Sequence, residues 1–172
     1  MAQRLQAEHL TLPVLQRQAK SLVRQLEQAV QQIEDQLAIL RTEVPALDQR
    51  AQTLQSIKGV GAITALSVLA ELPELGTLNR GQAAALAGLA PHPRESGQWR
   101  GRRTIGGGRP PIRRALYMAA LVAARSSQPF KEFYQRLRLA GKPAKVALTA
   151  VMRKLVVLMN HLLKNPSLEP IN

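Results

Sequence analysis

Seven arginines are crowded into residues 94–114, and this side chain is well suited to binding phosphate. A planar guanidinium stays charged at any physiological pH and offers paired N–H donors that match two phosphate oxygens. Glu95 is the one acidic residue in this segment. The chemistry indicated is the binding of a phosphate-bearing polymer by Arg94, Arg100, Arg102, Arg103, Arg109, Arg113 and Arg114.

A second candidate for phosphate contact is the segment Ile57-Lys58-Gly59-Val60-Gly61. Two glycines around one apolar residue allow a tight turn with Val60 anchored inward. The Ala/Leu/Val run that follows predicts a helix beginning at once, and the free N–H groups of a helix start bind anions. Lys58 could add a charge. The segment resembles the helix-hairpin-helix motif of proteins that grip the DNA backbone; a glycine-rich turn without a ligand is the alternative.

The distribution of charge also points to a polyanionic partner. The chain has a net charge of +13, yet residues 1–74 hold seven basic and eight acidic residues, while residues 75–172 hold 17 and three. The first part is therefore close to neutral, at −1, and the second carries +14. Such asymmetry is typical of nucleic-acid binding. A merely basic or ribosome-associated protein is the alternative.

Several classes of protein are disfavoured by composition. Cysteine is absent, so disulfides and thiolate metal sites are excluded. The first ten residues lack the apolar core of a signal peptide, and the longest apolar run is too short to span a bilayer. His9, His92 and His161 show no metal-ligand spacing. We expect a cytoplasmic protein without a membrane partner, a metal site or a cofactor of its own.

The residues upstream of the glycine turn predict a long helix over 13–43. A single apolar stripe needs a partner, and no other local segment offers a matching one. We favour a coiled-coil arm that forms a homo-oligomer; a helix lying on its own domain is the alternative. The stripe recurs at steps of three and four, as a heptad pattern with one stutter, through Leu15, Ala19, Leu22, Leu26, Ala29, Ile33, Leu37 and Leu40.

Prolines and glycines divide the rest of the chain into shorter helices. Proline is favoured at helix starts, and Asn79 is suited to cap one. Residues 91–111 hold much of the glycine, proline and arginine and predict a long loop or small hairpin. The last helix should face the core with Val146, Ala150, Val151, Leu155, Leu158 and Leu162. Besides the helix after Gly61, the expected helices cover 45–56, 80–88, 111–126, 129–139 and 143–164.

These elements predict an all-α fold. Aromatic residues make up 3% of the chain, so the core must be built from Leu, Val, Ile and Ala, which suits packed helices. We expect a coiled-coil arm over 1–52, a compact helical domain over 53–165 that contains the glycine turn and the Arg-rich loop or β-hairpin, and a disordered tail over 166–172.

Most of the chain, over residues 54–164, resembles a known family. Five motifs occur in the order expected for the C-terminal domain of DEDD-type insertion-sequence transposases, the family also known as bridge-RNA-guided recombinases. They are the Gly-Val-Gly turn, Ala87-Gly88-Leu89-Ala90-Pro91, Glu95-Ser96-Gly97, Arg113-Arg114-Ala115-Leu116-Tyr117 and Gly141-Lys142-Pro143.

The resemblance implies a function in DNA transposition and recombination. The serine at the family's nucleophile position is Ser96, which would attack a DNA phosphate with the arginines stabilising the developing charge. An ordinary loop serine among phosphate-binding arginines is the alternative. The family also implies DNA and a structured guide RNA as partners, and Mg²⁺ in an N-terminal RuvC-like domain with four carboxylates. That domain is missing from this sequence, so we expect no magnesium site here.

Without those carboxylates, an inert truncated transposase or a helix-hairpin-helix binding module without chemistry stays open. The run Gly106-Gly107-Gly108 departs from the family, where a polar pair precedes a single glycine, and it predicts a more flexible loop. Trp99 could stack on a base or anchor the hairpin. For Tyr117 we favour packing over a role as nucleophile.

Overall fold

The computed structural model describes residues 2–93, 95–96, 99–101 and 103–167. The chain divides into two compact units, Met1–Asp48 and Gln49–Asn172. Within the described residues there are seven helices and four two-residue strands, so the expected all-α class is confirmed. The predicted tail, 166–172, lies outside the described residues from position 168 onward.

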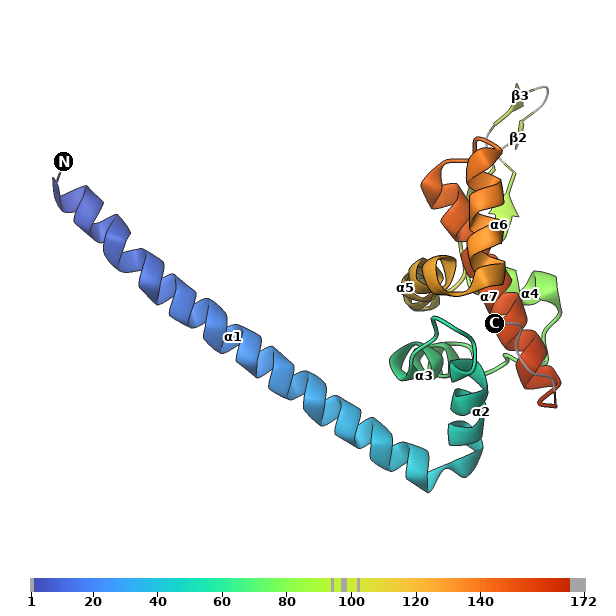
Figure 1. Ribbon diagram of the computed structural model, residues 1–172, viewed down its shortest axis with the longest axis horizontal. Coiled ribbons are helices and arrows are strands. Elements are labelled where there is room, and N and C mark those ends of the chain that lie inside the picture. The colour runs from blue at the N-terminus through green and yellow to red at the C-terminus, as the bar shows by residue number, and fades with distance from the viewer. Residues whose placement is uncertain (1, 94, 97–98, 102, 168–172) are drawn as a thin grey trace. The chain divides into compact units, whose positions relative to one another are not determined.

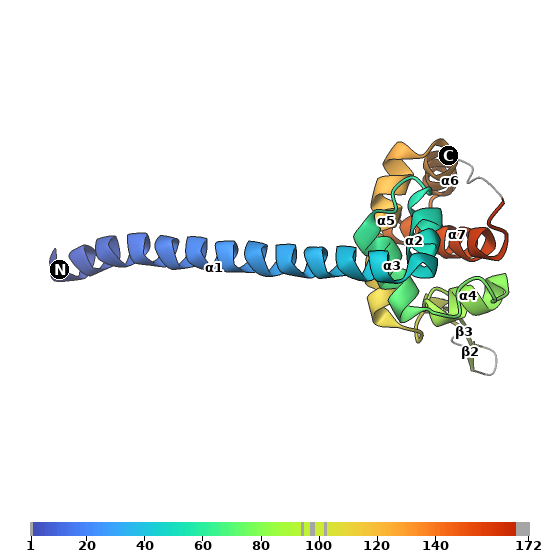
Figure 2. The same ribbon diagram turned by 90° about the horizontal axis from the view of Figure 1, so that it is seen from below.

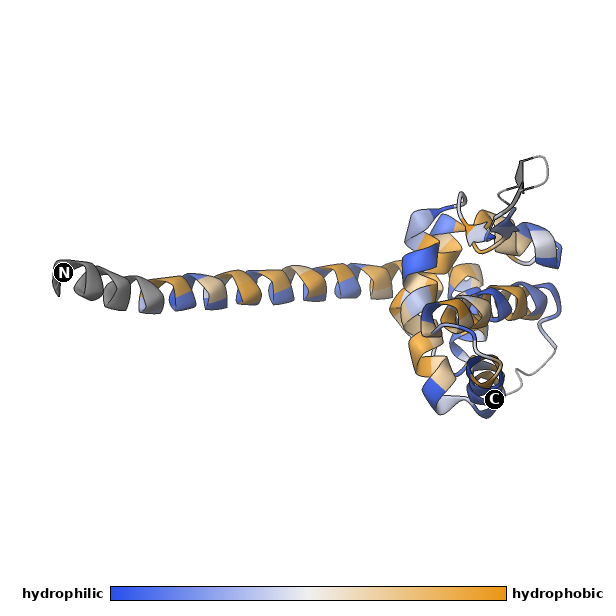
Figure 3. Cartoon of the chain, turned by 90° about the horizontal axis from the view of Figure 1, so that it is seen from above, coloured by the Kyte–Doolittle hydropathy of each residue, from blue (hydrophilic) through white to orange (hydrophobic). Residues whose placement is uncertain are grey.

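The first unit is dominated by one long helix, α1 (Ala2–Glu43), seen in Figure 1. The helix begins before the expected start and runs through Pro13, although a proline inside a helix removes one backbone hydrogen bond. Figure 3 shows hydrophobic and hydrophilic residues alternating along it. From residue 13 to 43 every side chain is exposed except Leu37 and Arg41, which are half-buried. The apolar stripe is therefore not covered within the described part of this unit.

An ion pair between two side chains lies at the end of helix α1. Val44 separates α1 from α2 (Pro45–Gln55), and the proline at the start of α2 fits a first helical position. Across this break the Arg41 Nε donates to the Asp48 Oδ1 at 2.6 Å. The ion pair therefore joins the end of one helix to the start of the next.

The second unit is a bundle of helices, drawn from two sides in Figures 1 and 2. Helix α5 packs against α3, α6 and α7, and α7 also packs against α4 and α6. Asn79 caps α4, as expected, since its Oδ1 accepts from the N–H groups of Gly81 and Gln82, both at 2.9 Å. The helices that follow α2 are α3 (Ala62–Glu71), α4 (Arg80–Leu86), α5 (Pro110–Ser126), α6 (Gln128–Leu139) and α7 (Ala144–Lys164).

Helix α7 supplies much of the core. By length and composition it could cross a membrane, but 50% of its most apolar stretch is buried in the unit, which is the pattern of a core helix. The expected inward stripe is correct at Val151, Leu155 and Leu162 and wrong at Val146, which is 52% exposed. The buried face is turned toward the neighbouring positions, and its fully buried members include Ala147, Val151, Leu155, Val156 and Met159.

The Arg-rich segment forms a short hairpin of two nested ladders. At its base β1 (Pro91–His92) pairs antiparallel with β4 (Thr104–Ile105). Nearer the tip β2 (Glu95–Ser96) pairs with β3 (Trp99–Arg100). Figures 1 and 2 both show β2 and β3 standing out beyond the helices of the second unit. Strands β2 and β3 therefore lie away from the helical core.

Candidate nucleic-acid interface

The turn between α2 and α3 is fixed by close packing on α5. Gly59 has φ +98°, and a Cβ there would lie 2.8 Å from the Ala123 backbone nitrogen and 3.0 Å from the Ala119 carbonyl oxygen. Ile57 and Val60 on either side of it are buried. Gly59 therefore lets the turn approach the backbone of α5, and Val60 points inward as the sequence predicts.

The second glycine of the turn lies in open space. Gly61 is the N-cap of α3 with φ −85°, it provides no side-chain cap, and a Cβ on it would meet nothing within 4 Å. The helix makes its first backbone bond from the Ala65 N–H to the Gly61 carbonyl. The N–H groups before Ala65 thus have no partner within the helix, and exposed Lys58 lies in the same turn.

A second close approach joins the end of α4 to the loop before α5. A Cβ on Gly108 would overlap the Gly88 nitrogen, so only glycine fits there. The Arg113 Nη1 donates to the carbonyl oxygens of Gly107, at 3.0 Å, and Gly88, at 3.3 Å. The Arg109 N–H donates to the Leu86 carbonyl at 2.8 Å. The glycine run is packed at Gly108 and bonded at Gly107. The expected flexibility of this loop stays a prediction.

Arg109 is bound to a carboxylate within the unit. Its two terminal nitrogens donate to the two oxygens of Glu74, at 2.9 and 2.7 Å. Nη1 also donates to the Glu71 carbonyl. The hydrogen bonds from Arg109, aided by a backbone bond at Glu74 itself, lower the pKa of Glu74 to about 2, and the same pairing raises the pKa of Arg109. Arg109 and Arg113 thus bind this chain's own groups.

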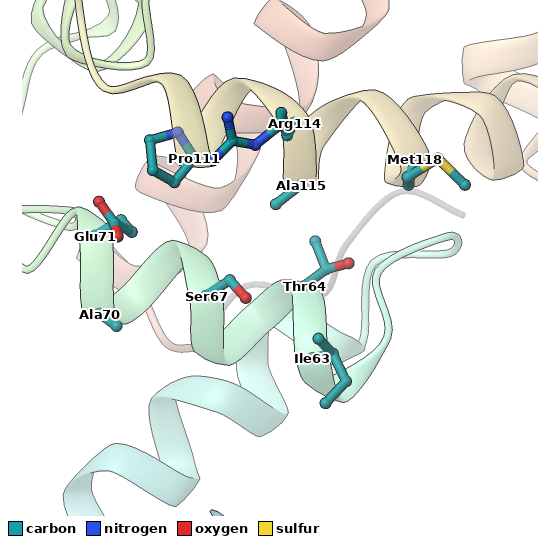
Figure 4. A pocket seen from close by; sticks show the side chains of 9 residues that line it. All are labelled: Ile63, Thr64, Ser67, Ala70, Glu71, Pro111, Arg114, Ala115 and Met118. Atoms are coloured by element: carbon teal, nitrogen blue, oxygen red, sulfur yellow. The ribbon is translucent and has the colours of Figure 1, made fainter. Parts of the chain in front are cut away.

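Arg114 of α5 lies beside a groove. The groove has a volume of about 590 Å³ and lies between α3 and α5. Figure 4 shows Thr64 and Ser67 of α3 facing Arg114 and Ala115 of α5 across it. Exposed Met118 closes one end. Of the arginines in the cluster whose side chains are described, Arg114 lines this groove.

The hairpin holds the remaining members of the predicted site. Ser96 pairs with Trp99, and Glu95 pairs with Arg100, in the ladder near the tip. The side chains of these four residues are not described, and Arg94 and Arg102 lie outside the described residues. Arg103 is exposed just before β4 and lines a pocket with Arg153 of α7. The structure therefore places Ser96 in a strand but does not describe its hydroxyl.

Sequence reasoning missed two groups of side chains. Arg153 was counted only within the net charge, because nothing in its neighbourhood marks it apart from other helical cations. Phe133 of α6 has Lys154 Nζ at 4.6 Å and Arg136 Cζ at 5.4 Å from its ring centre. The i, i+3 spacing of Phe133 and Arg136 could have signalled that contact.

The remaining candidates are Tyr117 and the possible metal ligands. Tyr117, expected to pack, is 41% exposed and lines a pocket with Leu121 and Tyr134. Among residues 2–93, 95–96, 99–101 and 103–167, no three histidine or acidic side chains come together in a way that could hold a metal ion. The described residues therefore offer no set of ligands for the Mg²⁺ that the resemblance implies.

The fold and the site together define a basic, all-α domain that displays a glycine turn and an arginine-bearing hairpin. Residues 51–135 match the model of the Transposase IS116/IS110/IS902 family. None of the curated proteins compared with this chain matches it. The family match supports a transposase domain with a role in transposition, and it implies DNA as a partner. The matched residues run from α2 through the turn, the hairpin and α5 into α6.

Proposed function

We propose that this chain is the DNA-binding C-terminal portion of an insertion-sequence transposase and that it presents Ser96 to a DNA phosphate. The proposal that this chain binds DNA rests on the turn at Gly61. There an uncapped helix start faces open space beside Lys58, while Gly59 holds the turn on α5. Helix starts of this kind receive phosphate oxygens through backbone N–H groups.

The grip on DNA is through its backbone. The second part of the chain carries the excess of positive charge, and phosphate contacts of this sort give affinity with little sequence preference. Arg103 and Arg114 are the described members of the cluster whose side chains are exposed, and we assign phosphate contacts to them. We expect the chain to act in the cytoplasm, where its DNA and a structured guide RNA would be met.

The proposed chemistry is a phosphoryl transfer to serine. The Ser96 hydroxyl gives its proton to a base, and an Oγ–phosphorus bond forms. The bond between phosphorus and one deoxyribose oxygen breaks, and that oxygen leaves as a hydroxyl after taking a proton. Arginines near Ser96 in sequence would stabilise the charge that builds on the phosphate. The carboxylates of a RuvC-like domain would come from outside the described residues.

The binding half is tested by fluorescence anisotropy with a duplex of arbitrary sequence. Affinity should fall more than about tenfold between about 50 and 200 mM salt, as counterions are released. Gly61→Val should weaken binding about tenfold by blocking the N–H groups, with helix content unchanged by circular dichroism. Ala70→Val, an exposed change at the other end of α3, is the matched control. Salt-independent binding, or equal loss in both variants, would contradict the phosphate grip.

The proposed role of Ser96 as nucleophile is tested by trapping a covalent DNA adduct in the presence of a carboxylate-bearing RuvC-like partner. Ser96→Ala should retain duplex affinity and form no adduct, while Ser67→Ala on α3 should form it as the native chain does. An adduct that persists in Ser96→Ala would place the nucleophile elsewhere. Tight binding without any adduct in the native chain would favour the second candidate, a DNA-binding module without chemistry.

A further inference from the structure

A pocket of about 440 Å³ lies at the base of the hairpin, between β4 and α7. We call it the hairpin-base pocket. Its hairpin side includes Ile105, and its α7 side includes Val146 and Ala150. The volume is within the range of pockets that hold small organic ligands. The function proposed above leaves this pocket without a role.

The walls of the hairpin-base pocket are apolar and partly exposed to solvent. Val146 is 52% exposed and Ile105 is 39% exposed, although both are residues that usually lie in a core. Covering such surface is favourable in proportion to its area. The pocket therefore favours an occupant with an apolar face.

Arg153 of α7 brings positive charge to the same pocket. The acidic side chains described in the second unit are Glu71, Glu74 and Glu132, and none of them lines the pocket. Since a guanidinium binds phosphate and also stacks on flat rings, the charge complements an occupant that joins an anionic group to an apolar plane.

We propose that the hairpin-base pocket holds one unstacked nucleotide of the bound DNA, with its base against Val146 and Ile105 and a phosphate at Arg153. The inference rests on the proposed function. A DNA strand held at Ser96 and running along the hairpin would bring its neighbouring nucleotides to the hairpin's base. Taking a base out of a duplex costs stacking and pairing, and the cost is least where the base is already unpaired. Preference for an unpaired nucleotide is therefore the signature to measure.

The probe is a duplex with one unpaired 2-aminopurine, compared with the same duplex fully paired. The native chain should bind the first about tenfold more tightly and change its fluorescence. Ala150→Phe, which fills the pocket, and Arg153→Gln, which removes its charge, should each bring the ratio of the two affinities near one. Lys154→Gln makes the same change of charge one residue away, beside Phe133 rather than this pocket, and should keep the ratio.

The outcomes separate this inference from the proposed function. If the native chain binds both duplexes equally, with salt dependence intact, the pocket assignment fails and the backbone grip stands. If it binds neither, both fail. A ratio that survives Arg153→Gln would put the unpaired nucleotide elsewhere. If Ala150→Phe instead changes the sedimentation of the protein without DNA, the pocket receives a second copy of the chain, and the nucleotide assignment is wrong.

Discussion

Two glycines one residue apart in the same turn have different tasks. Gly59 needs its backbone conformation and has no room for a side chain, whereas Gly61 has ordinary angles and open space around it. The first position therefore concerns stability, and the second is available for a ligand. A sequence pattern treats the pair as one motif, but substitutions should separate them.

Gly59→Ala should lower the free energy of unfolding by about 2 kcal/mol or more, because φ +98° is costly for alanine and its methyl group would press on the Ala123 backbone. Urea denaturation followed by circular dichroism measures it. Gly61→Ser should leave stability unchanged or slightly higher, since serine is a good N-cap. Equal losses at both sites would contradict the packing of Gly59 on α5.

A buried amide on α7 should matter as much as any apolar core residue. Asn160 is 5% exposed; its Oδ1 accepts from the Gly76 N–H at 2.8 Å, and its Nδ2 donates to the Leu78 carbonyl at 2.7 Å. Asn160→Leu keeps the size but leaves two backbone groups unpaired, so stability should fall by about 2–3 kcal/mol. Thermal unfolding measures the loss.

Asn165 provides the control for Asn160. Among the described residues, its side-chain Nδ2 bonds to His161, within the last turn of α7 and its cap. Asn165→Ala should change stability by less than about 0.5 kcal/mol. If the two asparagine substitutions cost the same, the contacts of Asn160 with Gly76 and Leu78 contribute little.

At the scale of elements, the segment between α3 and α4 is the point where three helices are tied together. Arg50 of α2 donates to the Leu75 carbonyl at 2.9 Å, Asn160 of α7 binds Gly76, and Arg109 at the start of α5 binds Glu74. The segment has no regular structure of its own. Its conformation therefore depends on these side chains, which come from 23 or more residues away.

The pairing of Glu74 with Arg109 predicts a pH dependence of stability. The folded state lowers the pKa of Glu74 from 4.5 to about 2. A depressed carboxylate pKa stabilises the fold above the unfolded value, and this contribution disappears as pH falls from 4.5 through about 2. Glu74→Gln should therefore be less stable than the native chain at pH 7, and the two should converge near pH 2.

Urea denaturation at a series of pH values checks this expectation. Glu132→Gln is the control, because the bond that Glu132 accepts within the described residues comes from Gln128 on its own helix. Its difference from the native chain should be small throughout. A difference between Glu74→Gln and native that stays constant from pH 7 to pH 2 would show that the carboxylate charge is not what stabilises the segment.

The helices were largely predictable because their signals are local. Pro45, Asn79 and the paired prolines that open α5 lie at or beside the predicted starts, and the cap at Asn79 involves near neighbours. The hairpin was predicted only as one of two options for residues 91–111. Its ladders join residues with no strong alternation of apolar and polar types, so no local pattern distinguished it from a loop.

The residue types of the candidate site were predictable from the sequence, but the groups that those residues bind were not. Sequence shows that Arg109 and Arg113 are cationic and close to Ser96 in the chain. It does not show that Arg109 pairs with Glu74, 35 residues earlier. Nor does it show that Arg113 donates to the carbonyl oxygens of Gly88 and Gly107. The exposure of Val146 was not predicted either, since an apolar stripe inferred from helical periodicity can be shifted by one position.

At the scale of the whole molecule, the two units have different surfaces. The long α1 shows an exposed apolar stripe, and within the described part of its unit nothing covers it. An amphipathic helix of this length gains most of its stability from packing, since an isolated helix in water is marginal. A second copy of the same stripe would supply that packing by interlocking heptads.

Leu26 is 66% exposed on this stripe and is the position at which to test self-association. Leu26→Glu should weaken association more than about tenfold, because each copy loses a buried leucine and gains a charge. Gln25→Glu makes the same glutamate one position off the stripe and should leave association unchanged. Sedimentation velocity over a range of concentrations measures both. A native chain that sediments as a monomer throughout, with Leu26→Glu lowering its melting temperature, would instead mean that the stripe packs within its own chain.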